Sequence, residues 1–133
     1  MPHLILDYSS NIREEADMPA LCTKLADCLI HQQSNGSPVY PIGGVRVRAI
    51  AVSEYCIANG LANAAFVHAQ LKIGHGRSEE IKKITGDSLF AVMKTHFADL
   101  EQKMGLALSL EINEFSELAT WKQNNLHALY PKN

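Results

Sequence analysis

Hydrophobic and polar residues alternate in short runs of the chain and recur at helical spacing in two longer ones. Alternating or continuous apolar runs predict strands at 3–8, 45–52, 65–73 and 106–112. Apolar residues three or four positions apart predict one amphipathic helix over roughly 19–33 and a second from Ser78 to Leu100. Asp17, just ahead of Pro19, is a suitable N-cap for the first helix. The pattern predicts a chain of mixed strands and helices.

The dipeptide Asn59-Gly60 stands between the two central predicted strands and is typical of a tight turn. We therefore expect the strands at 45–52 and 65–73 to pair as a hairpin. Arg46 and Arg48 should share one face of the first of these strands, because side chains alternate along a strand. Two arginines in this arrangement are more often a solvated or interface-paired face than a substrate clamp.

The two halves of the chain share one plan. Residues 3–29 and 68–93 each run through a strand, a short loop, an arginine, two consecutive glutamates and an amphipathic helix. Repetition of this kind predicts two β-α-β units related by pseudo-twofold symmetry. The predicted organisation is a single domain over 1–133, with repeats at about 2–53 and 64–113 and a C-terminal arm at 114–133.

Size and charge narrow the classes of partner. The chain has 133 residues, of which 47% are hydrophobic, which suffices for one domain with a core. A net charge of −2 gives no general attraction to nucleic acid or to anionic membranes. The sequence shows no stretch of transmembrane length and no signal peptide, so a cytoplasmic protein with small-molecule or subunit partners is expected.

Neither the cysteines nor the histidines have the spacing of a metal site. Cys22, Cys28 and Cys56 are odd in number and form no Cys-x-x-Cys pair, so we expect neither a disulfide framework nor a zinc knuckle. Cys22 and Cys28 should be packing residues on or near the first helix. His68 and His75 bracket a predicted strand, but no carboxylate or cysteine stands at a usual ligand spacing. No metal site is expected.

Pro2 is the candidate for proton transfer. It follows Met1 directly, and removal of Met1 would leave a secondary amine at the start of the first strand. An α-amino group titrates at about 7.7 to 8.0, and an apolar pocket or nearby cations would lower its pKa toward the pH at which a general base works best. If Met1 is retained, the Pro2 nitrogen is a tertiary amide and cannot act as a base. By position alone, a tolerated second residue is the strongly favoured interpretation of Pro2, so its catalytic role depends on the rest of the chain.

An ordered set of segments resembles one known family. The segments are Pro2, Asn11 to Asp17 (NIREEAD), Gly43 to Arg48 (GGVRVR), Ala65 to His68 (AFVH), Leu71 to Ser78 (LKIGHGRS), Lys94 to Phe97 (KTHF) and Lys122 to Leu129 (KQNNLHAL). With these segments the chain resembles the 5-carboxymethyl-2-hydroxymuconate delta-isomerase family of the tautomerase superfamily. The resemblance extends over nearly the whole length.

The resemblance implies a fold, an assembly and an activity. The fold is an α+β two-layer arrangement of two fused β-α-β units, with a four-stranded mixed sheet and two helices on one face, assembled as a homotrimer. The activity moves a proton between carbons of 5-carboxymethyl-2-hydroxymuconate, in the degradation of homoprotocatechuate and 4-hydroxyphenylacetate. The family uses no metal or organic cofactor, and its substrate is a small anionic dicarboxylate or tricarboxylate.

The resemblance also assigns roles to residues. Pro2 would be the catalytic base and acid, and Arg46 and Arg77 would bind the substrate. Arg48, on the same strand face as Arg46, and Arg13, the counterpart of Arg77 in the first unit, are weaker candidates. Without the resemblance, Arg77 could equally form a surface ion pair with one of the glutamates that follow it.

Two departures from the family pattern leave alternatives open. The segment 34–40 looks longer than in the family, and 53–63 carries small residues in place of more polar and aromatic ones. The substrate could therefore be a related enol dicarboxylate. A non-catalytic trimer that retains Met1 is the rival from a different class.

Overall fold

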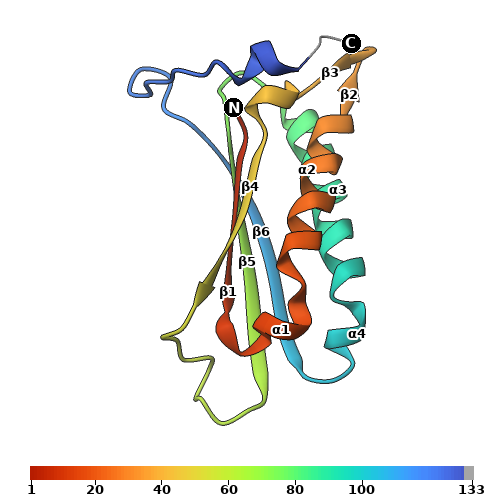
Figure 1. The fold of residues 1–133 in the computed structure, drawn as a ribbon, viewed down its shortest axis with the longest axis vertical. Coiled ribbons are helices and arrows are strands. Elements are labelled where there is room, and N and C mark those ends of the chain that lie inside the picture. Colours follow the sequence, from red (N-terminus) through yellow and green to blue (C-terminus); the bar gives the residue numbers. More distant parts are fainter. Residues whose placement is uncertain (131–133) are drawn as a thin grey trace.

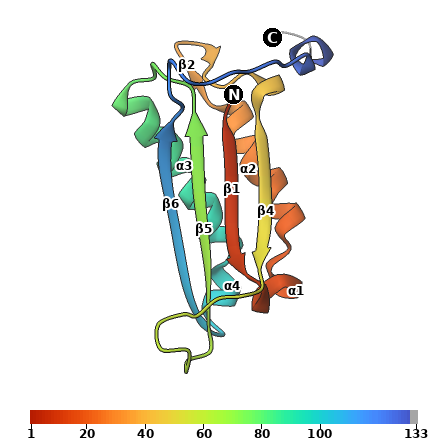
Figure 2. The same ribbon diagram turned by 90° about the vertical axis from the view of Figure 1, so that its left-hand side faces the viewer.

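One mixed β-sheet, covered by helices on one face only, forms the body of the computed structural model, which describes residues 1–130 (Figures 1 and 2). The sheet strands are β1 (His3–Ser9), β4 (Arg46–Val52), β5 (Ala64–Ile73) and β6 (Gly105–Glu114). The long helices are α2 (Met18–His31) and α3 (Glu79–His96). The predicted α+β two-layer fold with a four-stranded mixed sheet is confirmed.

Shorter elements connect these parts. They are the helices α1 (Arg13–Ala16) and α4 (Ala98–Glu101), the two-residue strands β2 (Gln33–Ser34) and β3 (Ser37–Pro38), and the 3₁₀ turns η1 (Ser10–Ile12), η2 (Ile42–Gly44) and η3 (Leu126–Leu129).

The strand order in the sheet is β4-β1-β5-β6, and this corrects the predicted hairpin. Strand β1 is parallel to β4 and antiparallel to β5, so it lies between the two strands that were expected to pair. The connection over 53–63 has eleven residues, and its Gly60 takes a left-handed φ of 79° within it. A connection of this length passes the end of β1, whereas a hairpin through Asn59-Gly60 would need both strands to reach that turn.

The chain runs twice through strand, helix and parallel strand. Strands β1 and β4 are joined through α2, and β5 and β6 are joined through α3. Parallel neighbours require such a crossover, because a tight turn can only join antiparallel strands. The antiparallel pair of β1 and β5 brings the two units together at the centre of the sheet.

Alternation along the strands explains why the helices cover one face. In β1 the side chains of Leu4, Leu6 and Tyr8 are buried, while the residues between them are only partly buried. Strand β5 repeats this pattern, and both buried rows pack against the apolar faces of α2 and α3. The core residues contributed by the helices include Leu21, Leu25, Leu29, Leu89 and Met93.

The helix boundaries follow local capping. The predicted cap is confirmed, since Asp17 takes φ of 45° and its side chain accepts a hydrogen bond from Ala20 N at 3.4 Å. Helix α2 begins one residue before the predicted start and ends two residues before the predicted end. The second helix ends at His96, and the predicted range to Leu100 is interrupted at Phe97 before α4 begins.

Beyond β6 the chain crosses the end of the sheet that carries the N-terminus (Figure 2). The backbone N–H of Phe115 donates to Ile73 O at 2.8 Å, and the segment then passes to the η2 turn. The last three residues of the predicted arm, 131–133, lie outside the described residues. Within residues 1–130, no helix combines the length and the apolar character needed to cross a membrane.

Candidate functional site

The pairing of β1 brings three segments to the N-terminus. In the parallel ladder with β4, His3 is opposite Arg46, so the two strands start at the same end of the sheet. In the antiparallel ladder with β5, His3 is opposite Lys72, so β5 finishes at that end. The loop from β5 to α3, which contains Arg77, therefore begins beside the start of β1.

Pro2 is buried at this end and carries a peptide bond to Met1. Its carbonyl oxygen accepts a hydrogen bond from the backbone N–H of Arg46 at 3.0 Å. The α-amino group at this position is that of Met1. Burial lowers the pKa of this amine most, and the charges of Lys122, Arg77 and Arg46 lower it further, in that order. Two of the predicted arginines are thus close to the terminal amine, together with a lysine that sequence reasoning missed.

Arg46 is held by the turn that precedes its strand. Its Nη1 donates to Gly44 O at 2.9 Å and lies 3.7 Å from Met1 Sδ. Gly44 itself permits the close approach, because a Cβ atom there would lie 3.3 Å from Met1 Cα and 3.6 Å from Pro2 Cδ. The guanidinium is therefore oriented toward the N-terminal residue by the backbone of η2.

Arg77 is positioned by backbone carbonyls and by an aromatic ring. Its Nη2 donates to Val39 O at 3.0 Å and its Nη1 donates to Gly74 O at 3.3 Å. Its guanidinium carbon lies 4.6 Å from the centre of the Tyr40 ring, an arrangement worth on the order of 1 kcal/mol. Glu79, one of the two glutamates that follow Arg77 and could have paired with it, pairs with Lys82 at 2.6 Å.

Tyr40 is a site residue that sequence reasoning missed. It is fully buried, and its hydroxyl forms a hydrogen bond of 2.8 Å with Thr85 Oγ1. Burial raises the pKa of Tyr40, while the bond to Thr85 and the charge of Arg77 act in the opposite direction. The ring is fixed by this buried bond to α3 and so provides a rigid support for Arg77. The only sequence signal was its place at the end of the segment 34–40.

The structure separates the weaker candidates from the terminal amine. Arg48 lies two residues further along β4, and its Nη1 donates to His3 Nδ1 at 3.2 Å. The pKa of His3 is lowered by burial first and then by Arg48, Arg46 and the terminal amine. Arg13 begins α1, which follows β1 and lies at the opposite end of the sheet from the N-terminus (Figure 1).

The two segments that depart from the family pattern lie at opposite ends of the sheet. Segment 34–40 is at the N-terminal end, where Val39 and Tyr40 contact Arg77. Segment 53–63 follows β4 at the far end, because β4 is parallel to β1 (Figure 2). Within one subunit, therefore, segment 34–40 helps to position Arg77 near the amine, and segment 53–63 is remote from it.

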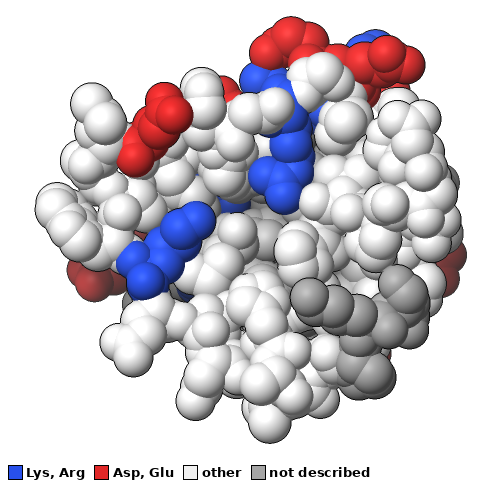
Figure 3. Space-filling view, turned by 90° about the horizontal axis from the view of Figure 1, so that it is seen from above, with Lys and Arg blue, Asp and Glu red and all other residues white. Residues whose placement is uncertain are grey.

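The C-terminal segment completes this end of the molecule. Asn124 Nδ2 donates to Gly43 O at 2.9 Å and lies 3.3 Å from Met1 Sδ. Seen from this end, lysine and arginine side chains form two separate groups with uncharged surface between them (Figure 3). The arrangement has the properties of an anion-binding site: fixed cations and hydrogen-bond donors around a partly buried amine.

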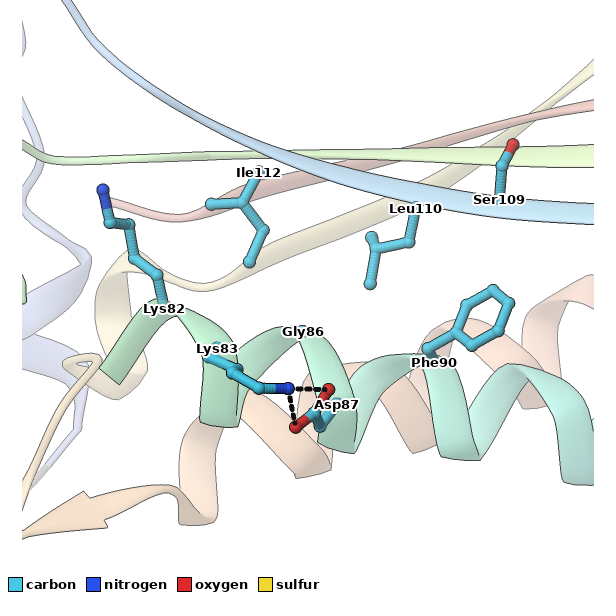
Figure 4. A pocket seen from close by; sticks show the side chains of 8 residues that line it. All are labelled: Lys82, Lys83, Gly86, Asp87, Phe90, Ser109, Leu110 and Ile112. Atoms are coloured by element: carbon cyan, nitrogen blue, oxygen red, sulfur yellow. Dashed lines mark hydrogen bonds and ion pairs between the residues drawn. The ribbon is translucent and has the colours of Figure 1, made fainter. Parts of the chain in front are cut away.

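A groove of about 580 Å³ lies elsewhere, between α3 and β6 (Figure 4). Its lining includes Phe90, Leu110, Ile112 and the exposed ion pair of Lys83 with Asp87 at 2.9 Å. None of the residues that line it belongs to the group around the amine. The carboxylate in its lining, Asp87, is exposed to solvent and paired with Lys83, so the N-terminal end, with its partly buried amine, is the better candidate for chemistry.

The chain is similar to known proteins over almost its whole length. A family model described as 5-carboxymethyl-2-hydroxymuconate isomerase matches residues 2–130. A 5-carboxymethyl-2-hydroxymuconate Delta-isomerase of Escherichia coli is 44% identical over 130 residues, which are 98% of this chain and 99% of that protein.

Solved structures agree with this similarity. The crystal structure of a 5-carboxymethyl-2-hydroxymuconate isomerase from Deinococcus radiodurans superposes with a TM-score of 0.91 at 49% identity, covering 98% of this chain and 95% of that one. A protein described as a fused 4-OT symmetric trimer shares the fold, with a TM-score of 0.63 at 16% identity over 91% and 93% of the two chains.

Replacing Lys122 by Met should raise the pKa of the terminal amine toward its ordinary value. Removal of a nearby positive charge stabilises the protonated amine, so the amine would lose its proton at higher pH in the variant. The measurement is the ¹³C NMR titration of the reductively methylated protein carrying Met1. Lys103→Met, at the far end of the sheet, is the control and should leave this pKa unchanged; equal shifts in both variants would contradict the placement of Lys122.

Proposed function

The chain belongs to the 5-carboxymethyl-2-hydroxymuconate isomerase family, and on this premise we propose that it isomerises 5-carboxymethyl-2-hydroxymuconate with the nitrogen of Pro2 as the proton carrier. The observation that carries the proposal is the convergence of Arg46, Arg77 and Lys122 on one partly buried amine. The aromatic catabolism and the cytoplasmic location expected from the sequence belong to the same proposal.

The charges of the substrate match those of the site. A muconate has two carboxylates, and the carboxymethyl group adds a third. Three cations act on the terminal amine, two of them arginines held by backbone carbonyls. Arginine is suited to carboxylates because its planar fork can donate two parallel hydrogen bonds. The match supports a tricarboxylate as substrate.

The proposal requires that Met1 be removed. The Pro2 nitrogen then becomes a secondary amine, one residue closer to the buried start of β1. The causes that lower the pKa of the Met1 amine, burial and three positive charges, would act on this nitrogen as well. A lowered pKa leaves more of the amine unprotonated near neutral pH, as a general base requires.

The reaction balances with one proton. The Pro2 nitrogen takes a proton from the 2-hydroxymuconate, and negative charge spreads over the substrate oxygen and the conjugated carbon chain. Arg46 and Arg77 stabilise this charge, since both guanidinium groups are oriented before the substrate binds. The proton removed is that of the 2-hydroxyl group, and the same nitrogen returns it to a carbon of the conjugated chain, which gives the conjugated ketone and restores the free amine.

A homotrimer is the second part of the proposal. The helices cover only one face of the sheet, and the other face exposes Ile50 to 48%. Leu118 and Trp121 on the C-terminal segment are 95% and 88% exposed. Uncovered apolar side chains on a sheet face and on a projecting segment favour contacts between subunits. The fused 4-OT protein with this fold is described as a symmetric trimer, which supports the same assembly here.

Pro2→Ala should lower kcat for 5-carboxymethyl-2-hydroxymuconate by at least about 100-fold, because it replaces the secondary amine by a primary amine of different geometry and basicity. The assay is the change in ultraviolet absorbance, with protein whose intact mass shows that Met1 is removed. Wild-type protein that isomerises no faster than buffer would favour a related enol dicarboxylate or a non-catalytic trimer. Near wild-type turnover in Pro2→Ala would remove Pro2 as the base.

Arg46→Ala and Arg77→Ala should each lower kcat/KM by roughly 100- to 1000-fold, because each removes a preorganised donor for the developing charge. Arg48→Ala should have a smaller effect, since Arg48 contacts His3 instead of the N-terminal residue. Arg13→Ala, at the far end of the sheet, is the matched control within one subunit. Comparable losses in all four variants would mean that the assignment of Arg46 and Arg77 is wrong.

Sedimentation equilibrium should give a mass about three times the 14.7 kDa of the chain. Ile50→Glu, on the open face of the sheet, should reduce this mass because it buries a charge in the contact between subunits. Ile84→Glu is a matched control, since Ile84 is also 48% exposed but lies on the helix layer. A monomer at every concentration, or dissociation caused equally by both variants, would contradict the proposed trimer.

A further inference from the structure

Two side-chain donors converge on the sulfur atom of Met1. Arg46 Nη1 lies 3.7 Å from Met1 Sδ, and Asn124 Nδ2 lies 3.3 Å from the same atom. One donor comes from the start of β4 and the other from the C-terminal segment. A thioether sulfur is a weak acceptor. The two donors are therefore suited to a stronger acceptor than the one they contact.

Consecutive carbonyls of the η2 turn orient both donors. Gly44 O accepts from Arg46 Nη1 at 2.9 Å, and Gly43 O accepts from Asn124 Nδ2 at 2.9 Å. Each donor nitrogen carries two hydrogens. One hydrogen of each is taken by the turn. The second hydrogen of Arg46 Nη1 faces Met1 Sδ, and the second hydrogen of Asn124 Nδ2 is shared between Met1 Sδ and His127 Nε2, which lies at 3.2 Å. The geometry is built by the backbone and does not depend on the sulfur.

The Asn124 side chain has one orientation. Its Oδ1 accepts from Leu126 N at 2.8 Å, which leaves Nδ2 to face Gly43 O and the N-terminal residue. His127 Nε2 lies 3.2 Å from the same nitrogen. The segment approaches the turn so closely that a Cβ atom on Gly43 would lie 2.9 Å from the backbone of His127. Asn124 is therefore as firmly placed as Arg46.

We propose that Asn124 is a substrate-binding residue, whose amide donates together with Arg46 to one carboxylate oxygen of the substrate at the position of Met1 Sδ. This inference rests on the proposed function, because removal of Met1 both frees the Pro2 nitrogen and vacates that position. A carboxylate oxygen is the stronger acceptor that the two donors are suited to, since charge-assisted hydrogen bonds are about twice as strong as neutral ones.

Lys122, two residues before Asn124, places the same segment close to the reacting nitrogen. Of the three positive charges near the terminal amine, that of Lys122 lowers the pKa of this amine most. The C-terminal segment therefore supplies one wall of the site, with a donor and a cation. Neither residue was among the candidates that the resemblance assigned.

The test compares Asn124→Ala and Asn124→Asp in protein from which Met1 is removed. Asn124→Ala should lower kcat/KM by roughly 10- to 100-fold, chiefly through KM, because a hydrogen bond to a charged group is lost. The kcat/KM of Asn124→Asp should be lower still, because the introduced carboxylate repels the anionic substrate. A merely structural role predicts the reverse order, since Asp keeps the acceptor for Leu126 N. Activity of Asn124→Asp equal to or above that of Asn124→Ala overturns the proposal.

Asn125 provides matched controls. It is the exposed neighbour of Asn124, and its own role in η3 is through its backbone carbonyl, which accepts from Ala128 N. Asn125→Ala and Asn125→Asp make the same chemical changes one position away. The kcat/KM of both Asn125 variants should stay within about twofold of the wild-type value. If Asn125→Asp lost as much kcat/KM as Asn124→Asp, the loss would be due to general charge repulsion, and the assignment of Asn124 would be overturned.

A binding measurement separates this inference from the proposed function. Propane-1,2,3-tricarboxylate carries three carboxylates and no double bond to isomerise, and calorimetry gives its Kd without turnover. Weaker binding to Asn124→Asp by at least about tenfold supports the inference even if wild-type protein does not isomerise the muconate. Wild-type isomerisation with unchanged binding and unchanged kcat/KM in both Asn124 variants retains the proposed function and overturns the inference. A wild-type protein that neither binds nor turns over contradicts both.

Discussion

Strand β1 is hydrogen-bonded along both of its edges, and the candidate site depends on the registers of these two ladders. The parallel ladder sets the start of β4 beside the start of β1, and the antiparallel ladder sets the end of β5 there as well. A slip of one residue in either ladder would turn every side chain of the moved strand to the other face. After such a slip of β4, Arg46 would point toward the helix layer and away from the N-terminal residue.

Positively charged side chains surround the terminal amine, whose protonated form is already disfavoured by burial. Lys122, Arg77 and Arg46 act on the amine in the same direction, and each is held by a different segment of the chain. Like charges held this close oppose folding unless an anion is bound. The proposed polyanionic substrate would relieve this repulsion on binding, so an arrangement that is unfavourable in the empty protein would favour the complex.

The structure shows which parts of the pattern were sufficient for prediction. Alternation and helical spacing located all four sheet strands and both long helices to within a few residues, because each buries a regular stripe of apolar side chains. The pairing of β4 with β5 was wrong, since Asn59-Gly60 is a local signal and strand order is decided by crossovers between distant segments. Arg46 and Arg48 share a strand face as expected, yet only Arg46 contacts the N-terminal residue.

The sequence by itself determined the elements, the α+β composition of the chain and the residue types from which the chemistry is proposed, because these follow from local spacing and from the side chains themselves. Only the tertiary structure decided that Arg77 packs on the Tyr40 ring, that Lys122 lowers the pKa of the terminal amine and that Asn124 contacts Met1. Tyr40, Lys122 and Asn124 lie in irregular segments without a hydrophobic period. Their positions are set by backbone carbonyls, a buried hydroxyl and the close packing of the C-terminal segment on glycine, and such contacts exist only once the sheet has brought the segments together.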